Sequence, residues 1–270
     1  MSELFSYGFL TTALIVTLLA AASTALLSVF VTLRKLSFMS NALSHVSFAG
    51  IALALWTGIG MHSAVLAVVI IVALLTGFLN EYYKVKEENI ITVFLAVAMA
   101  SAVIMLSLTE NYTINITSYL FGDILLVEHK DVYRIAVMLL LNFLFIICFF
   151  KELFYMCYNQ ETAAAYGIPV RVIYYVFLIF LAVNIVLTVK IVGIILITAQ
   201  FILPGITALN ITDRIKPAII SSLLISEVAG LGGFGISFYF SKIPTGSMIV
   251  IILFLIYLLS FIIKKIRVIN

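Results

Sequence analysis

The sequence predicts an all-α, polytopic membrane protein, a bundle of transmembrane helices that forms one domain over residues 1–270. Of the 270 residues, 64% are hydrophobic and only 10% are charged, against roughly 25% charged residues in an average soluble domain. Nine helical spans of about 20 apolar residues each would use about 180 residues, close to the number that the composition supplies. Almost nothing is left for an extramembrane domain, so a soluble globular enzyme is excluded.

The first predicted span begins near residue 8, and no Lys or Arg precedes it. Its apolar run is too long for the core of a cleaved signal peptide, so we expect it to remain in the mature protein. Long apolar segments with few charges then predict nine spans, at residues 8–33, 37–59, 62–80, 90–109, 133–150, 171–189, 191–208, 217–240 and 246–263. The weakest division is at Lys190, which alone separates two runs, and an eight-span version with one re-entrant segment stays open.

The basic residues predict the orientation, because cytoplasmic connections carry an excess of Lys and Arg. With the N-terminus outside and the C-terminus in the cytoplasm, eleven of the fifteen basic residues face the cytoplasm: Arg34, Lys35, Lys84, Lys86, Lys151, Arg171, Arg214, Lys216, Lys264, Lys265 and Arg267. The net charge of +3 is small and dispersed, which excludes nucleic acid as a partner and leaves the lipid bilayer and proteins in or beside it. Cys148 and Cys157 lack metal-site spacing and are interpreted as structural.

Two connections are long enough to hold structure of their own. The outer one contains the segment 119–126, which is too apolar for a solvated loop and too short to cross the membrane, so we expect a re-entrant or interfacial helix. The inner one offers Asn159 as an N-cap, alanines at 163–165, Gly167 at a left-handed end position and Pro169 as a stop. This pattern predicts a short cytoplasmic helix between two spans.

Small residues cluster in the eighth predicted span, where four glycines occur within six positions: Gly230, Gly232, Gly233 and Gly235. Small residues let helices approach closely within a bilayer. The cluster therefore indicates a packing or kink site, or a hinge in a moving helix.

Few ionisable side chains fall inside the predicted spans. Placing a charged side chain at the centre of a span costs at least about 2.5 kcal/mol of insertion free energy. His45 and Glu227 are such residues, and Asp123 lies at the edge of the outer segment. Asn41 precedes His45 by four residues, so both lie on one helix face, where an imidazole and an amide oxygen could hold a divalent metal transiently. The alternatives are a packing role for His45, helix locking for Glu227 and loop capping for Asp123.

Several chemical motifs are absent from the sequence. It contains no GxxxxGK[ST] phosphate loop, so it does not bind ATP in the Walker fashion. It also lacks HExxH, GxSxG and any dense group of acidic, His or Cys residues that an enzyme would need. The chain is therefore predicted not to be an enzyme, and another polypeptide must supply the energy for any driven transport.

One ordered set of motifs carries a family resemblance, from about residue 30 to 263. The segments 33–50 (LRKLSFMSNALSHVSFAG), 120–125, 161–168, 190–196 with 203–205, and 244–246 resemble the membrane permease subunits of bacterial ABC importers for zinc, manganese or iron. The resemblance implies a homodimer in the bacterial cytoplasmic membrane, two cytoplasmic ATPase subunits and an external metal-binding protein. Metal would cross by alternating access, as cargo rather than as a stable cofactor, with zinc or manganese favoured.

The resemblance also assigns roles to residues. The segment from Glu161 through Ala165 to Gly167 matches the coupling helix, which docks on the ATPase. In the family an Asp stands four residues before the His and the pair is thought to contact the ion, whereas this chain has Asn41. The missing negative charge should weaken the hold on a hard cation, and Asp123 or Glu227 are the candidates to supply it.

Other functions predict different features. An importer of a chelated or small organic substrate would have a wide apolar cavity without His45 near its axis. A membrane-embedded enzyme would bring acidic, His or Cys residues together at one depth. A passive channel would work without an ATPase and without the capped cytoplasmic helix.

Overall fold

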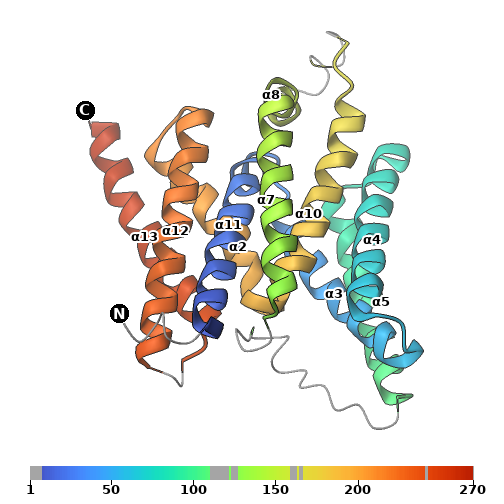
Figure 1. The fold of residues 1–270 in the computed structure, drawn as a ribbon. Helices are drawn as coiled ribbons and strands as arrows, with labels where there is room; N and C mark the ends of the chain where they lie inside the picture. Colours follow the sequence, from blue (N-terminus) through green and yellow to red (C-terminus); the bar gives the residue numbers. More distant parts are fainter. Residues whose placement is uncertain are drawn as a thin grey trace.

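The chain is all-helical in the computed structural model, which describes residues 8–109, 122, 127–158, 163, 167–240 and 243–269 (Figure 1). The described part contains ten helices: α2 (Gly8–Leu33), α3 (Ser37–Thr57), α4 (Met61–Tyr83), α5 (Glu87–Ser107), α7 (His129–Cys148), α8 (Phe150–Tyr158), α10 (Val170–Val192), α11 (Ile194–Ile211), α12 (Ile215–Tyr239) and α13 (Thr245–Ile269). Each of the nine predicted spans corresponds to one long helix, so the polytopic helical prediction is confirmed.

Eight helices of the described part are long and apolar enough to cross a bilayer, namely all except α8 and α11. The helix α11 is apolar but shorter, with 18 residues and Pro204 inside it. The beginning of α2 and the end of α13 lie at opposite ends of the bundle (Figure 1), so the chain traverses it an odd number of times. A ninth pass through α11 satisfies this requirement. We call the two ends the N-terminal end and the C-terminal end of the bundle.

The boundary between α10 and α11 lies at Gly193, and the predicted division at Lys190 was wrong. Gly193 has φ 92° and ψ 152°, a conformation that only glycine adopts without strain. Lys190 instead lies in the last turn of α10. Its ammonium group pairs with Asp131 at 2.9 Å, which lets the charge remain within an otherwise apolar helix.

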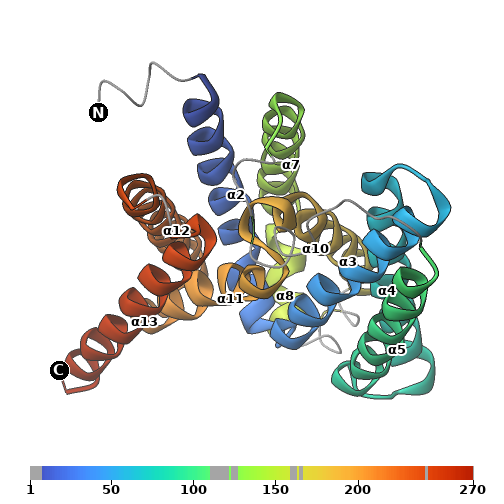
Figure 2. The ribbon, with the colours of Figure 1, turned by 90° about the horizontal axis from the view of Figure 1, so that it is seen from below.

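Of the eight candidate spans in the described part, α2 is the most buried, and it packs against α7, α11 and α12 (Figure 2). A buried polar cluster joins it to α7 and α10. The Asn142 amide nitrogen donates to Ser23 Oγ at 2.8 Å and to Asn184 Oδ1 at 2.9 Å, and Asn184 donates back to Asn142 at 3.1 Å. Because water is absent from the bilayer core, such polar groups must satisfy one another across helices.

The glycine cluster of α12 serves close packing at Gly233. A Cβ atom there would lie 2.5 Å from Ile249 Cγ1 and 2.8 Å from the Ile249 backbone nitrogen. A Cβ at Gly235 would meet nothing within 4 Å. Among the four glycines, Gly233 is therefore the one that sets the approach of α13 to α12 most tightly.

The predicted end of the short cytoplasmic helix is confirmed at Gly167. This residue has φ 73°, and the Ile168 backbone N–H donates to the Ala163 carbonyl at 3.1 Å, the bond of a Schellman end. The rest of this helix, at 159–166, lies outside the described residues apart from Ala163. The predicted outer helix at 119–126 also lies outside them apart from Gly122. Cys157 lies in α8, and the thiols of Cys148 and Cys157 are both free.

Candidate functional site

Asn41 and His45 lie on α3, which begins at Ser37 and ends where Gly58 takes a left-handed conformation. Three serines of this helix are buried, and each donates its hydroxyl to the carbonyl three residues earlier: Ser40, Ser44 and Ser47. These three hydroxyl groups therefore donate their hydrogen bonds within α3. The polar side chains on its more open side are Asn41 and His45.

The open side of α3 consists of Phe38, Asn41, His45 and Phe48, which follow one another at helical spacing. Phe38 is 37% exposed and the other three are partly buried, whereas the residues between them are buried. The helix α11 lies beside it (Figure 2). Thr198 of α11 donates its hydroxyl to Asn41 Oδ1 at 2.9 Å. His45 has no hydrogen-bonding partner among the residues that the structure describes, so its imidazole is available to a ligand.

One chain does not assemble a tight cation site in its described part. No group of three or more His, Cys, Asp or Glu side chains there could hold a metal ion. What the open side of α3 offers is one imidazole and one amide oxygen that already accepts a hydrogen bond. Two neutral ligands suit brief contact with a passing cation better than stable binding, because hard cations are held most strongly by several anionic oxygens.

The structure does not bring Glu227 to this site. Glu227 lies on α12, which packs against α2, α11 and α13. It follows Leu223 by one helical turn, and Leu223 faces a groove between α2, α7 and α12. That groove and α3 lie on different sides of α2 (Figure 2). Of the remaining predicted site residues, Asp123, Glu161 and Ala165 lie outside the described residues.

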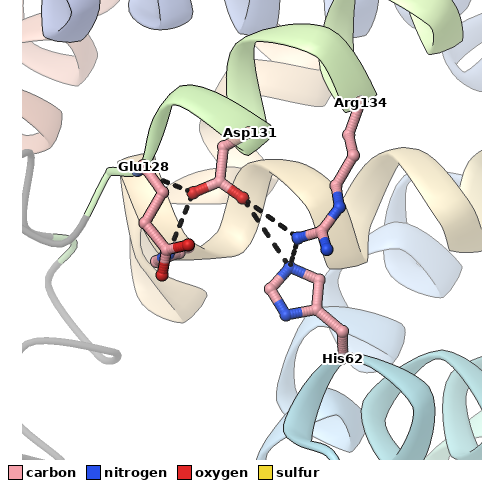
Figure 3. Close-up of polar contacts among 5 residues, drawn as sticks. His62, Glu128, Asp131 and Arg134 are labelled. Atoms are coloured by element: carbon pink, nitrogen blue, oxygen red, sulfur yellow. Dashed lines mark hydrogen bonds and ion pairs between the residues drawn. The ribbon is translucent and has the colours of Figure 1, made fainter.

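An ionic cluster that the sequence did not reveal surrounds Asp131 at the N-terminal end of the bundle (Figure 3). The Asp131 carboxylate is 7% exposed and accepts hydrogen bonds from Lys190 Nζ at 2.9 Å, from the Glu128 backbone N–H at 3.0 Å and from Arg134 Nη1 at 3.3 Å. His62 Nε2 lies 3.9 Å from the same carboxylate and 3.0 Å from Arg134 Nη1.

This cluster ties the beginnings of α4 and α7 to the end of α10. Two sequence signals pointed to it without showing which residues would meet. One is the capping box of Glu128 and Asp131 at the start of α7, and the other is Lys190 within an apolar run. His62 of α4 belongs to the cluster through its contacts with Arg134 and Asp131.

At the opposite end of the bundle, a polar recess of about 420 Å³ lies beside the start of α10. It is lined by Arg34, Asn80, Glu81, Lys84, Val170, Arg171 and Tyr174. Arg171 forms an ion pair with Glu81, and the Arg34 guanidinium lies 5.2 Å from the centre of the Tyr174 ring. Two of its lining residues, Val170 and Arg171, thus closely follow Gly167, the predicted end of the short helix.

Comparison with known proteins places these features in context. The model of the ABC 3 transport family matches residues 6–264. The chain is 31% identical to a probable metal transport system membrane protein of Thermotoga maritima, covering 95% of this chain and 90% of that protein. It is 31% identical to the chelated iron transport system membrane protein YfeD of Yersinia pestis (98% and 89%) and 27% identical to the manganese transport system membrane protein MntC of Halalkalibacterium halodurans (96% and 88%).

Two solved structures have the same arrangement of helices. PsaBC from Streptococcus pneumoniae, in complex with Fab, superposes with a TM-score of 0.86 at 26% identity, covering 100% of this chain and 98% of that one. An inward-facing putative metal-chelate type ABC transporter superposes with a TM-score of 0.75 at 13% identity, covering 96% and 87%. The second likeness concerns the fold alone.

Proposed function

The chain belongs to the ABC 3 transport family, and from this premise we propose that it is the permease through which an ABC importer moves a divalent metal ion. Relatives at 27–31% identity are described as manganese, iron or metal transport proteins, which supports a cargo of this class. ATP hydrolysis belongs to a separate subunit. The chain is a multi-pass membrane protein and not itself the ATPase.

The observation that carries the proposal is the open side of α3. His45 and Asn41 are only partly buried at one helix face within a span, next to Thr198 of α11. A second copy facing this side would contribute the same residues across a shared axis, giving four neutral ligands around a path. Weak and brief coordination is what a permease needs, because a tightly held ion would not be released.

The distribution of charge supports an orientation, and the orientation indicates at which end each partner implied by the family would dock. Of the fifteen basic residues, eleven belong to the segments at the C-terminal end of the bundle, which by the positive-inside rule is cytoplasmic. Two ATPase subunits would dock there on the segment 161–167, which shortly precedes Val170 and Arg171 of the polar recess in the sequence. An external metal-binding protein would deliver the cargo at the N-terminal end.

The test is metal accumulation in cells that express the permease together with its ATPase. His45→Ala should lower manganese, iron or zinc uptake at least tenfold at an equal membrane level. The matched control is His129→Ala, at an exposed residue of the N-terminal end, which should leave uptake unchanged. Equal uptake by the wild type and His45→Ala would place the path elsewhere.

Asn41→Asp tests the charge of the path independently. An added carboxylate beside the imidazole should strengthen cation binding and change the ranking of manganese, iron and zinc. An unchanged ranking would show that Asn41 does not contact the cargo.

Coupling to the ATPase is tested by Glu161→Arg. In an importer this change should abolish metal-linked ATP turnover and uptake together, whereas the flux of a passive channel would not change. A chelated cargo is the second candidate, because YfeD is described as a chelated iron transporter. Uptake of the chelate in competition with free ions distinguishes the two.

A further inference from the structure

An apolar groove opens between α2, α7 and α12, and α3 lies on a different side of α2 from α7 and α12 (Figure 2). It has a volume of about 620 Å³, within the range of small-molecule sites. Its lining consists entirely of apolar side chains: Leu19, Ala22, Leu26, Ala136, Leu139, Leu140, Phe143, Ile219, Ile220 and Leu223. Leu140, Phe143 and Ile220 are more than half exposed, so the groove is open along its length.

The groove lies mainly in one half of the bilayer. Phe143 is five residues from the end of α7 and Leu26 is seven residues from the end of α2, or about 8–10 Å at the helical rise of 1.5 Å. Leu19 is about 21 Å from the same end. Because the hydrocarbon core is about 30 Å thick, most of the groove lies among the acyl chains of the leaflet at the C-terminal end, and its deepest part, at Leu19, reaches the middle of the bilayer.

A basic group stands at the shallow end of the groove. Lys216 precedes Ile219 and Ile220 by one turn of α12, so it lies on the same side of that helix. Its Nζ lies 5.3 Å from the centre of the ring of Phe150, the first residue of α8. The contact joins the two helices that flank the groove, just beyond Phe143.

The charges around this point favour an anionic headgroup. The segments 151–152 and 213–216 carry three basic residues against two acidic ones: Lys151, Arg214 and Lys216 against Glu152 and Asp213. At the deep end, Glu227 stands one turn beyond Leu223 on the same side of α12, outside the apolar lining. The groove is thus basic at the bilayer surface and apolar below it. These two parts complement the anionic headgroup and the acyl chains of a phospholipid.

We propose that this groove binds one phospholipid, with an acyl chain between α2, α7 and α12 and its phosphate at Lys216. In the orientation proposed above, the lipid comes from the cytoplasmic leaflet, whose anionic lipids attract basic groups. A helix of a partner protein is the alternative occupant, and photo-crosslinking distinguishes it from a lipid.

The first experiment is native mass spectrometry of the purified permease with added phosphatidylglycerol or phosphatidylcholine. One phospholipid per chain should survive gentle activation, and Ala136→Phe, which fills the groove, should lower its retention at least tenfold. The matched control is Ala67→Phe, at an exposed alanine of α4 that does not line the groove. Equal retention in the two variants would overturn the proposal.

The headgroup is tested by Lys216→Glu against Lys265→Glu, the same charge change at an exposed lysine of α13. Removing one basic contact should reduce the preference for phosphatidylglycerol at least about fivefold, and reversing the charge should reduce it further. The control should keep the preference. If Lys216→Glu and Lys265→Glu lost the preference for phosphatidylglycerol equally, the preference would reflect general attraction of anionic lipid to the basic end of the bundle. That result would overturn the assignment of Lys216.

A photo-crosslinking residue at Phe143 gives a measurement that does not depend on filling the groove. In intact cells it should capture phospholipid, whereas the same residue at Phe254, exposed on α13, should capture much less at equal incorporation. Equal lipid capture at both positions would indicate ordinary annular lipid and contradict the proposal. Capture of a protein, or of a second copy of the chain, at Phe143 would also contradict it.

Discussion

Removing the charge of Asp131 should loosen the N-terminal end of the bundle. The Asp131 carboxylate is 7% exposed and its partner Lys190 is 13% exposed, so neither charge is well solvated. Asp131→Asn keeps the shape of the side chain but leaves the Lys190 ammonium without its nearest anion. Removing one partner of a fully buried pair costs about 3–5 kcal/mol.

The expected cost at Asp131 is below that range for two structural reasons. Lys190 keeps some solvent contact, and the Glu128 carboxylate remains 3.7 Å from its Nζ. We therefore expect a loss of about 2–3 kcal/mol in the free energy of unfolding. For a chain of this size, that corresponds to a fall in melting temperature of about 4–12 °C.

The assay is thermal unfolding of the purified permease in detergent, followed by size-exclusion chromatography of a fluorescent fusion. The matched control is Glu128→Gln, because the Glu128 side chain is 66% exposed and an exposed ion pair contributes less than about 1 kcal/mol. The double variant Asp131→Asn with Lys190→Met should recover part of the loss, since no unpaired charge is left. The reasoning would be refuted if Asp131→Asn lowered the melting temperature no more than Glu128→Gln.

Three further predictions concern packing and reactivity. Asn142→Ala should cost about 1–2 kcal/mol in the same thermal assay, because its hydrogen-bonded partners in α2 and α10 lose a buried neighbour. Gly205→Ala should destabilise the bundle by about 1–3 kcal/mol, since its Cβ would lie 2.5 Å from a carbonyl oxygen of α2, whereas Gly235→Ala meets no atom within 4 Å and should not. Burial raises the pKa of the Cys157 thiol to about 12, so it stays protonated at pH 7–9. In a Cys148→Ser background, Cys157 should therefore react with a soluble maleimide far more slowly in the folded protein than after denaturation in SDS, and equal rates would contradict this.

Much of the architecture could be predicted because it depends on local sequence. A bilayer span needs a run of apolar residues of fixed length, so the ranges of the nine long helices were visible in the chain. The helix end at Gly167 could be predicted for the same reason, since a left-handed glycine followed by proline is a local signal. Placing Asn41 and His45 on one face required only the period of the helix.

The division of α10 from α11 shows where local reasoning failed. Lys190 interrupts an apolar run, and a charge in such a run suggests a boundary. In the structure its ammonium group meets Asp131, which is 59 residues away in the chain, and the helix continues to Val192. Nothing near Lys190 in the sequence indicates this partner.

The sequence by itself determined that the chain is a helical membrane protein, which segments cross the bilayer, and which few polar residues enter the spans. The tertiary structure alone decided how those residues are grouped. It placed Asn41 against Thr198, separated Glu227 from His45, and gathered Asp131, Lys190 and His62 from three helices. The reason is physical: helix formation is set by neighbours along the chain, whereas partners across a bundle depend on which faces of distant helices pack together.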